Sequence, residues 1–293
     1  MPKGEIKLSA SEQIISKQIE WAKNKGLQLV GSAGQRGRKV YTTKIADNLF
    51  KPLNIETKKE LEAGDGGELN GKMDRPAKIQ ALHSSSALGI NVFDYWREST
   101  DISIITASCG LSRADRELAG EIQFEQKFSI DNRFQYSPNL DVVIIPQSGK
   151  YRVLAIECKF TEAYSSRAHG GIDQKYFTNE EVWQKLSETQ RLAKKLSPND
   201  NRFQHLHAAQ LIKHILGLNR RFGHSHYRFL YLWYDALGEP GYVHRKEVEE
   251  FADVVRSDGV VFHETTYQDV IIRLGKYREG HGEYVKYLTN RYL

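Results

Sequence analysis

Apolar residues recur at helical spacing in some segments of this chain and at strand spacing in others. Ile14, Ile15 and Ile19 belong to an apolar stripe near the N-terminus, and three serines (84–86) precede a second helical run as capping residues do. From residue 119 onward, short apolar runs bounded by turn residues favour strands. The pattern predicts helices at 9–25, 87–96, 179–196, 203–218, 244–255, 267–274 and 282–290, and strands at 122–130, 140–145, 153–160, 229–233 and 260–263.

Strands that alternate with helices indicate an α/β (α+β) fold with a central mixed β-sheet flanked by helices. The glycine-containing turn at 147–150, QSGK, predicts that the two strands beside it form an antiparallel hairpin. We expect a core at residues 116–293. Residues 1–115 are expected to form an N-terminal extension of helices and loops that packs on this core.

Two glycine-rich segments interrupt the N-terminal part. Residues 31–44, rich in glycine and cations, are either a solvated loop or an arm that touches phosphates. Residues 63–76 lack the GxxxxGK[ST] pattern of a nucleotide-binding loop, so we interpret them as a loop or a hairpin turn. Asp65 and Glu68, in this second segment, are acids that could face a site.

The composition restricts the class of protein. A chain of 293 residues with 40% hydrophobic content can bury a sizeable core. Its formal net charge of +5 permits a nucleic-acid partner without requiring one. Two cysteines give neither a disulfide framework nor the spacing of zinc ligands. The N-terminus has no apolar signal core and no run is long enough to span a bilayer, so we expect a cytoplasmic protein with no membrane partner.

The candidate chemistry lies on the strand at 153–160 and the strand before it. Side chains of a strand alternate between faces, so Glu157 and Lys159 share one face while Cys158 and its apolar neighbours take the other. Asp141 begins the preceding apolar strand, and the predicted hairpin brings it close to Glu157. Two neighbouring carboxylates repel each other, and a divalent cation such as Mg²⁺ relieves that repulsion.

Asp141 followed by Glu157-Cys158-Lys159, with hydrophobic strands and a turn between them, resembles the PD-(D/E)xK nuclease superfamily. Pro138 stands three residues before the aspartate, and Leu140 occupies the position where the family pattern has proline. The resemblance covers residues 124–164 best. It implies a restriction-endonuclease-like fold with Asp141 and Glu157 as metal-binding acids and Lys159 as the catalytic lysine.

The same resemblance implies a cofactor, a substrate and further candidate residues. Magnesium is the expected ion, with Mn²⁺ able to replace it, and double-stranded DNA is the expected partner. Relatives that cut both strands suggest a homodimer. Glu125 and Glu162 are candidates for a third acid or for a group that orients the lysine, and Gln210 matches a polar position that some members carry near the site.

We therefore predict a Mg²⁺-dependent endonuclease that hydrolyses DNA, with two alternatives. The first is a nucleic-acid-binding protein of the same fold without catalytic activity. The second is a zinc-supported module, because His205 with His207 and His224 with His226 form two HxH pairs. We place the first pair on the helix at 203–218, and the second in an arginine-rich turn at 219–228 that either is solvated or contacts phosphates.

Overall fold

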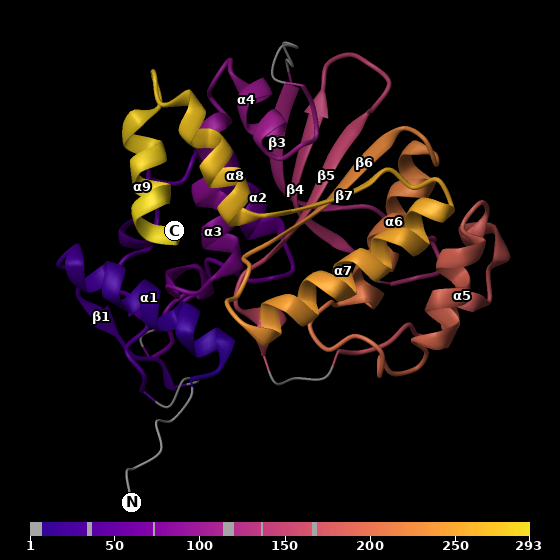
Figure 1. Cartoon of the computed structure of the whole chain (residues 1–293), viewed down its shortest axis with the longest axis horizontal. Helices are drawn as coiled ribbons and strands as arrows, with labels where there is room; N and C mark the ends of the chain where they lie inside the picture. Colours follow the sequence, from indigo (N-terminus) through magenta and orange to yellow (C-terminus); the bar gives the residue numbers. More distant parts are fainter. Residues whose placement is uncertain (1–7, 34–36, 73, 114–119, 136, 166–168) are drawn as a thin grey trace, which may run out of the picture.

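The structure is a computed structural model that describes residues 8–33, 37–72, 74–113, 120–135, 137–165 and 169–293. Its centre is a five-stranded sheet in the order β3-β4-β5-β6-β7 (Figure 1). These strands span Gly120–Lys127, Asn139–Pro146, Val153–Lys159, Tyr227–Trp233 and Phe262–Thr266, respectively. The first three are antiparallel neighbours, while β6 and β7 continue the sheet parallel to β5. The predicted fold class, with its mixed sheet, is confirmed.

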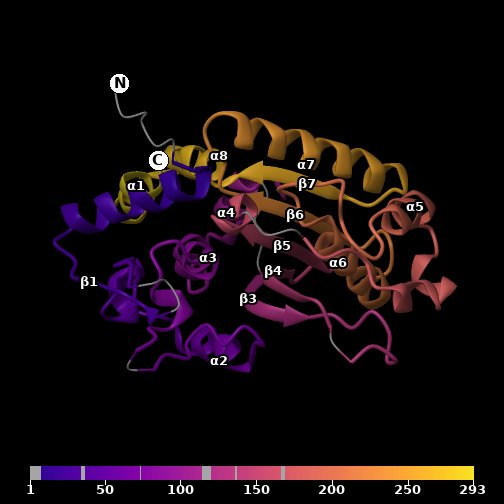
Figure 2. The same cartoon turned by 90° about the horizontal axis from the view of Figure 1, so that it is seen from below.

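Helices cover both faces of this sheet (Figures 1 and 2). On one face lie α5 (Ser187–Lys195), α6 (Ala208–Phe222) and α7 (Glu239–Ser257). The other face is covered by elements from both ends of the chain: α1 (Ala10–Asn24), α2 (Ile55–Ala63), α3 (Ser85–Phe93), α4 (Ile102–Ser108), α8 (Tyr267–Leu274) and α9 (Gly282–Tyr292). Two short strands, β1 (Leu29–Val30) and β2 (Tyr41–Thr42), pair separately.

Strand β5 is buried from Val153 to Cys158 because helices cover the sheet on both sides. A hydrophobic cluster lies on each face of the sheet. Ile156 and Cys158 belong to the cluster that includes the N-terminal helices, and Ala155 belongs to the cluster between the sheet and helices α6 and α7. The alternation predicted for this strand is therefore confirmed. Glu157 and Lys159 are its polar members, and they face α6.

Residues from the first and last parts of the chain pack together. The indole N–H of Trp96 donates to the Tyr284 hydroxyl over 3.0 Å, and the amide of Gln18 donates to the Arg291 carbonyl over 3.0 Å. One hydrophobic cluster contains residues of α1 and α3, of β3 to β5 and of α8 and α9. The division into residues 1–115 and 116–293 stays a prediction, but the two parts share this core.

Three predicted helices were wrong in their extent. The helix predicted at 244–255 begins five residues earlier, at Glu239. Residues 180–183 form a single 3₁₀ turn capped by Asn179, and Lys185 then takes a left-handed φ of 61°, so α5 begins only at Ser187. The helix predicted at 203–218 begins at Ala208. The reason is tertiary, because the Glu247 carboxylate of α7 accepts the backbone N–H groups of residues 204, 205 and 206. His205 and His207 therefore precede the helix.

Smaller differences affect the strands and loops. β3 ends at Lys127 rather than at residue 130, and β7 runs from Phe262 to Thr266 rather than over 260–263. The segment predicted at 63–76 is a loop, as expected, although Met73 lies outside the described residues. In the segment at 31–44, residues 34–36 also lie outside them. No helix among the described residues is long and apolar enough to cross a bilayer.

Candidate functional site

The hairpin of β4 and β5 brings the predicted site residues together. Val142 pairs with Ile156 and Val143 with Ala155, so Asp141 lies across from Glu157 one step beyond the last of these pairs. The Asp141 carboxylate also accepts the backbone N–H of Cys158 at Oδ2 over 2.7 Å. Asp141 is thus held against β5 at the residue between Glu157 and Lys159.

Glu157 is fully buried and is paired with two nitrogen-bearing side chains. Lys159 Nζ donates to Glu157 Oε1 over 2.5 Å, and His214 Nε2 of α6 lies 3.0 Å from Glu157 Oε2. Burial raises the pKa of Glu157, but Lys159 and His214 outweigh burial and bring the pKa to about 2. Glu157 is therefore a carboxylate at neutral pH.

The negative charge of Asp141 is balanced by fewer positive groups than that of Glu157. Its burial, followed by the neighbouring negative charge of Glu157, raises the pKa of Asp141 well above its usual value, and Lys159 offsets this only in part. Burial lowers the pKa of Lys159, but Glu157 and then Asp141 raise it above its usual value. The group of two acids and one lysine thus has an acid whose negative charge is poorly balanced, which a bound cation would relieve.

The donor set suits magnesium. Glu157 Oε2 lies 3.0 Å from His214 Nε2 and keeps a second lone pair for an ion, and Asp141 offers Oδ1 because its Oδ2 accepts the Cys158 N–H. Within the same residues, no three or more His, Cys, Asp or Glu side chains are arranged together as metal ligands. A divalent ion at this place would therefore take two carboxylates, with waters and a backbone carbonyl as its remaining ligands, which is a set that Mg²⁺ accepts.

Glu125 lies beside this group. It falls between the pairs Phe124–Val142 and Gln126–Leu140 of β3 and β4, so it stands across from Asp141. Its backbone adopts a left-handed φ of 53°, which is rare for a residue with a side chain and marks local strain. Burial, followed by the charge of Glu68, raises the pKa of Glu125 to about 7, and the Asn139 amide donates to its carboxylate.

The other auxiliary candidates differ in their positions. Glu162 accepts the backbone N–H of Phe160 over 3.1 Å, and its charge contributes to the raised pKa of Lys159. Gln210 lies on α6 one turn before His214, and its side chain makes no hydrogen bond within the described part of the chain. The structure thus brings Glu125 and Glu162 to the site, whereas the Gln210 side chain makes no hydrogen bond to any site residue among the described residues.

The N-terminal third supplies walls to the site. Ser85, Ser86 and Gly89 of α3 line a small cavity together with Glu125 and Asp141. Both serines also line an adjoining open cavity of about 320 Å³, which contains Glu68 and Glu162. Of the two acids in the loop at 63–76, Glu68 therefore faces the site. Asp65 is exposed and pairs instead with Lys127 over 2.8 Å.

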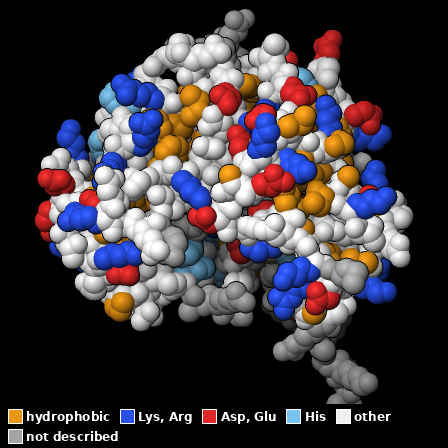
Figure 3. Space-filling model, turned by 180° about the vertical axis from the view of Figure 1, so that it is seen from behind, with side chains coloured by type: hydrophobic (Ala, Val, Ile, Leu, Met, Phe, Trp, Pro, Cys, Tyr) orange, Lys and Arg blue, Asp and Glu red, His pale blue; other side chains and the backbone are white. Residues whose placement is uncertain are grey.

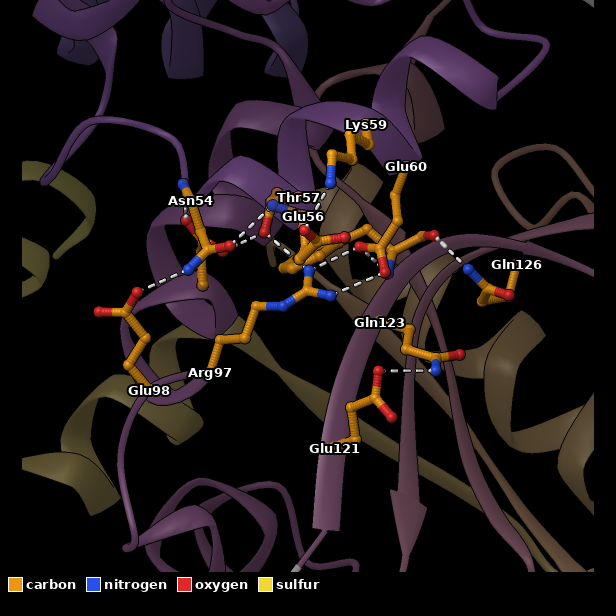
Figure 4. Close-up of polar contacts among 12 residues, drawn as sticks. Asn54, Glu56, Thr57, Lys59, Glu60, Arg97, Glu98, Glu121, Gln123 and Gln126 are labelled. Carbon is orange, nitrogen blue, oxygen red and sulfur yellow. Dashed lines mark hydrogen bonds and ion pairs between the residues drawn. The ribbon is translucent and has the colours of Figure 1, made fainter.

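A partly buried ion pair joins Arg97 to Glu60 of α2, and Glu60 in turn attaches α2 to β3 next to Glu125 (Figure 4). Arg97 donates two hydrogen bonds to the Glu60 carboxylate, over 2.6 and 2.8 Å, and Glu60 Oε2 accepts the backbone N–H of Phe124 over 3.1 Å. The Arg97 side chain is 9% exposed. The bidentate pair therefore fixes the backbone immediately before the strained residue.

Sequence reasoning missed His214. The available signal was the spacing of polar residues on α6, where Gln210 and His214 lie one turn apart. Three of the four histidines of the HxH pairs have other partners: His205 contacts the Ala163 carbonyl, His207 stacks on His169, and His224 contacts the Asp258 carbonyl. The turn predicted at 219–228 was wrong in its extent, because residues 219–222 belong to α6 and residues 227–228 to β6. Arg220 is therefore on the helix, and it donates to the Ile130 carbonyl.

The surface carries charges of both signs. On the face opposite to that of Figure 1, Lys and Arg side chains lie among acidic ones, and histidine side chains gather at a hollow (Figure 3). A mixed surface gives a weaker general attraction for nucleic acid than a single basic patch would.

A five-stranded mixed sheet flanked by helices is compatible with a restriction-endonuclease-like fold. A family model described as "Restriction Endonuclease associating with ARP" matches residues 10–293, and the chain therefore belongs to this family. The match includes the N-terminal third as well as the sheet. No curated protein and no solved structure matched the chain. Family membership supports a nuclease-related function.

Proposed function

We propose that this protein is a Mg²⁺-dependent endonuclease of the PD-(D/E)xK type that hydrolyses phosphodiester bonds of DNA. The observation that carries the proposal is the convergence of Asp141, Glu157 and Lys159 at one hairpin, with the Lys159 ammonium 2.5 Å from the Glu157 carboxylate. Membership of a restriction endonuclease family supports the same reaction class.

Each residue has a distinct task in this proposal. Asp141 and Glu157 would hold the ion from adjacent strands, and when bound it supplies a water of lowered pKa and neutralises charge on the scissile phosphate. Lys159 stays protonated because its two acidic neighbours raise its pKa despite burial. Its Nζ can therefore donate to the attacking oxygen or to the charge that develops on the phosphate.

The proposal extends to substrate, partners and location. We propose double-stranded DNA as the substrate, a homodimer as the form that cuts both strands, and the cytoplasm as the compartment. The net charge of +5 is compatible with a polyanionic substrate. The family description names an association with ARP, and we propose that this protein also associates with ARP.

A plasmid-cleavage assay tests this function. Wild-type protein should convert supercoiled plasmid to nicked or linear DNA with Mg²⁺ or Mn²⁺, and chelation with EDTA should stop the reaction. Asp141→Asn and Lys159→Ala should each lower the rate by about 100-fold or more while DNA binding is kept. Exposed Asp253 and Lys246 offer matched controls, so Asp253→Asn and Lys246→Ala should cleave like wild type.

The alternative function is DNA binding without catalysis. It would be supported if the wild-type protein bound DNA but cleaved no duplex, single-stranded or RNA substrate with any of several divalent metals. Equal cleavage by wild type and Asp141→Asn would instead place the catalytic residues elsewhere and contradict the proposed site.

A further inference from the structure

His214 is a buried histidine of α6, and no other residue of this helix hydrogen-bonds to its ring nitrogens. Its side chain is 1% exposed, and its neighbours Leu211, Ile215 and Leu218 on α6 are buried and apolar. Neither ring nitrogen has a well-aligned hydrogen-bond partner among the described residues. A buried polar group in that condition costs free energy, so its presence calls for a reason.

The polar group nearest to His214 is the candidate metal ligand Glu157. Nε2 of the imidazole lies 3.0 Å from Oε2 of the carboxylate, while Lys159 occupies the other oxygen. The imidazole is held in place by packing, because the Phe229 ring meets it edge to face with centroids 5.8 Å apart. The ring therefore has a defined position from which to restrain the carboxylate.

We infer that His214 is a positioning residue that holds Oε2 of Glu157 and so orients this carboxylate toward the metal site shared with Asp141. The inference rests on the proposed function. Groups behind a metal ligand fix its orientation, and their removal commonly weakens metal binding by about 10-fold to 100-fold. Lys159 alone would fix a single oxygen, whereas contacts at both oxygens restrict rotation of the carboxylate.

His244 provides a matched control on the same side of the sheet. It is also fully buried, but its two ring nitrogens contact the hydroxyls of Tyr231 and Tyr164 over 3.0 and 3.1 Å. Among the described residues, its hydrogen bonds and ring contacts go to tyrosine, tryptophan and histidine side chains and not to Glu157. A histidine that serves only the packing of this core should behave like His244, whereas a positioning residue should affect metal affinity.

Mn²⁺ titrations followed by electron paramagnetic resonance separate these roles. His214→Phe keeps an aromatic ring but has no nitrogen, and we expect its Mn²⁺ dissociation constant to rise by about 10-fold to 100-fold. His214→Gln retains an N–H donor, so it should recover most of the affinity. His244→Gln should lower the melting temperature and leave Mn²⁺ affinity unchanged.

Each outcome decides between distinct claims. If wild type binds Mn²⁺ and His214→Phe binds it equally well, the positioning role is wrong while the proposed function stands. If wild type binds no Mn²⁺, the proposed function itself fails, and the inference fails with it. Should His214→Phe not fold, nitrogen NMR of the wild-type histidines replaces it. Mg²⁺ should then shift the His214 ring signals but not those of His244, and unshifted His214 signals would overturn the inference.

Discussion

At the scale of single residues, the two acids of the candidate site differ in how well nearby donors balance their negative charge. Glu157 has Lys159 at one oxygen and His214 at the other, and its pKa is about 2. Asp141 has one backbone N–H at Oδ2 and a raised pKa. A cation between them would interact most strongly with the acid that is least balanced without it.

Buried His244 makes stability depend on pH. Burial lowers its pKa to about 3, against 6.5 for a free histidine. The unfolded chain therefore binds the proton more readily than the folded protein, and stability is lost as pH falls from about 6.5 toward 3. Between pH 7 and pH 5, protonation of this group alone should lower the free energy of unfolding by about 2 kcal/mol.

Urea denaturation at both pH values checks this prediction. His244→Gln cannot titrate, so its free energy of unfolding should fall by about 2 kcal/mol less than that of wild type over the same interval. Other histidines with lowered pKa values, such as His83 and His263, contribute equally to both proteins. The same pH dependence in both proteins would contradict the assignment to His244.

The main site residues were predictable from the sequence because strand periodicity is a local property. Alternation along β5 sufficed to place Glu157 and Lys159 on one face, and the QSGK turn sufficed to bring Asp141 beside them. His214 was not predictable in the same way. Its role depends on the packing of α6 against β5, two elements that lie more than 40 residues apart in the sequence.

At the scale of elements, the attachment of α2 to β3 supports the site. Arg97→Ala would leave the Glu60 carboxylate partly buried without its cation, and it would free the backbone before Glu125. Breaking a partly buried pair in this manner costs roughly 2 kcal/mol, and we expect slower cleavage as well.

Lys59 and Glu56 provide the control for this prediction, because they form an exposed pair on the same helix (Figure 4). Lys59→Ala should change the free energy of unfolding by less than about 1 kcal/mol and leave cleavage unchanged. Both variants can be compared by thermal unfolding and plasmid cleavage. Equal effects of the two substitutions would show that the Arg97 pair has no special role.

The elements also show where local sequence reasoning fails. Helix α6 begins five residues later than its apolar spacing predicts, because Glu247 of a distant helix takes the backbone donors of residues 204–206. In the segment before α5, the left-handed backbone at Lys185 interrupts an apolar pattern that looks continuous. Both boundaries are set by tertiary contacts or backbone conformation that apolar periodicity does not encode.

At the scale of the whole molecule, the N-terminal third shares a hydrophobic core with the sheet and with the C-terminal helices. Its residues share one hydrophobic cluster with β3, β4, α8 and α9, and Ser85 and Ser86 line the cavity beside Asp141. The composition and length indicated that a large core was possible. They could not show that the two ends of the chain would form one face of it.

Removal of residues 1–115 should therefore prevent stable folding. The fragment 116–293 would expose the face of the sheet that contains Ile122, Phe124 and Ile156. We expect it to bind the dye ANS and to lack a cooperative thermal transition, in contrast to the full chain. A soluble fragment that unfolds cooperatively would show that residues 116–293 form an independent domain.

The central claim is that Asp141 and Glu157 hold a catalytic metal ion beside Lys159, and anomalous scattering from crystals soaked in Mn²⁺ tests it most directly. We predict an anomalous peak between the carboxylates of Asp141 and Glu157. Manganese bound at another place in the chain, with no peak between these two acids, would contradict the account.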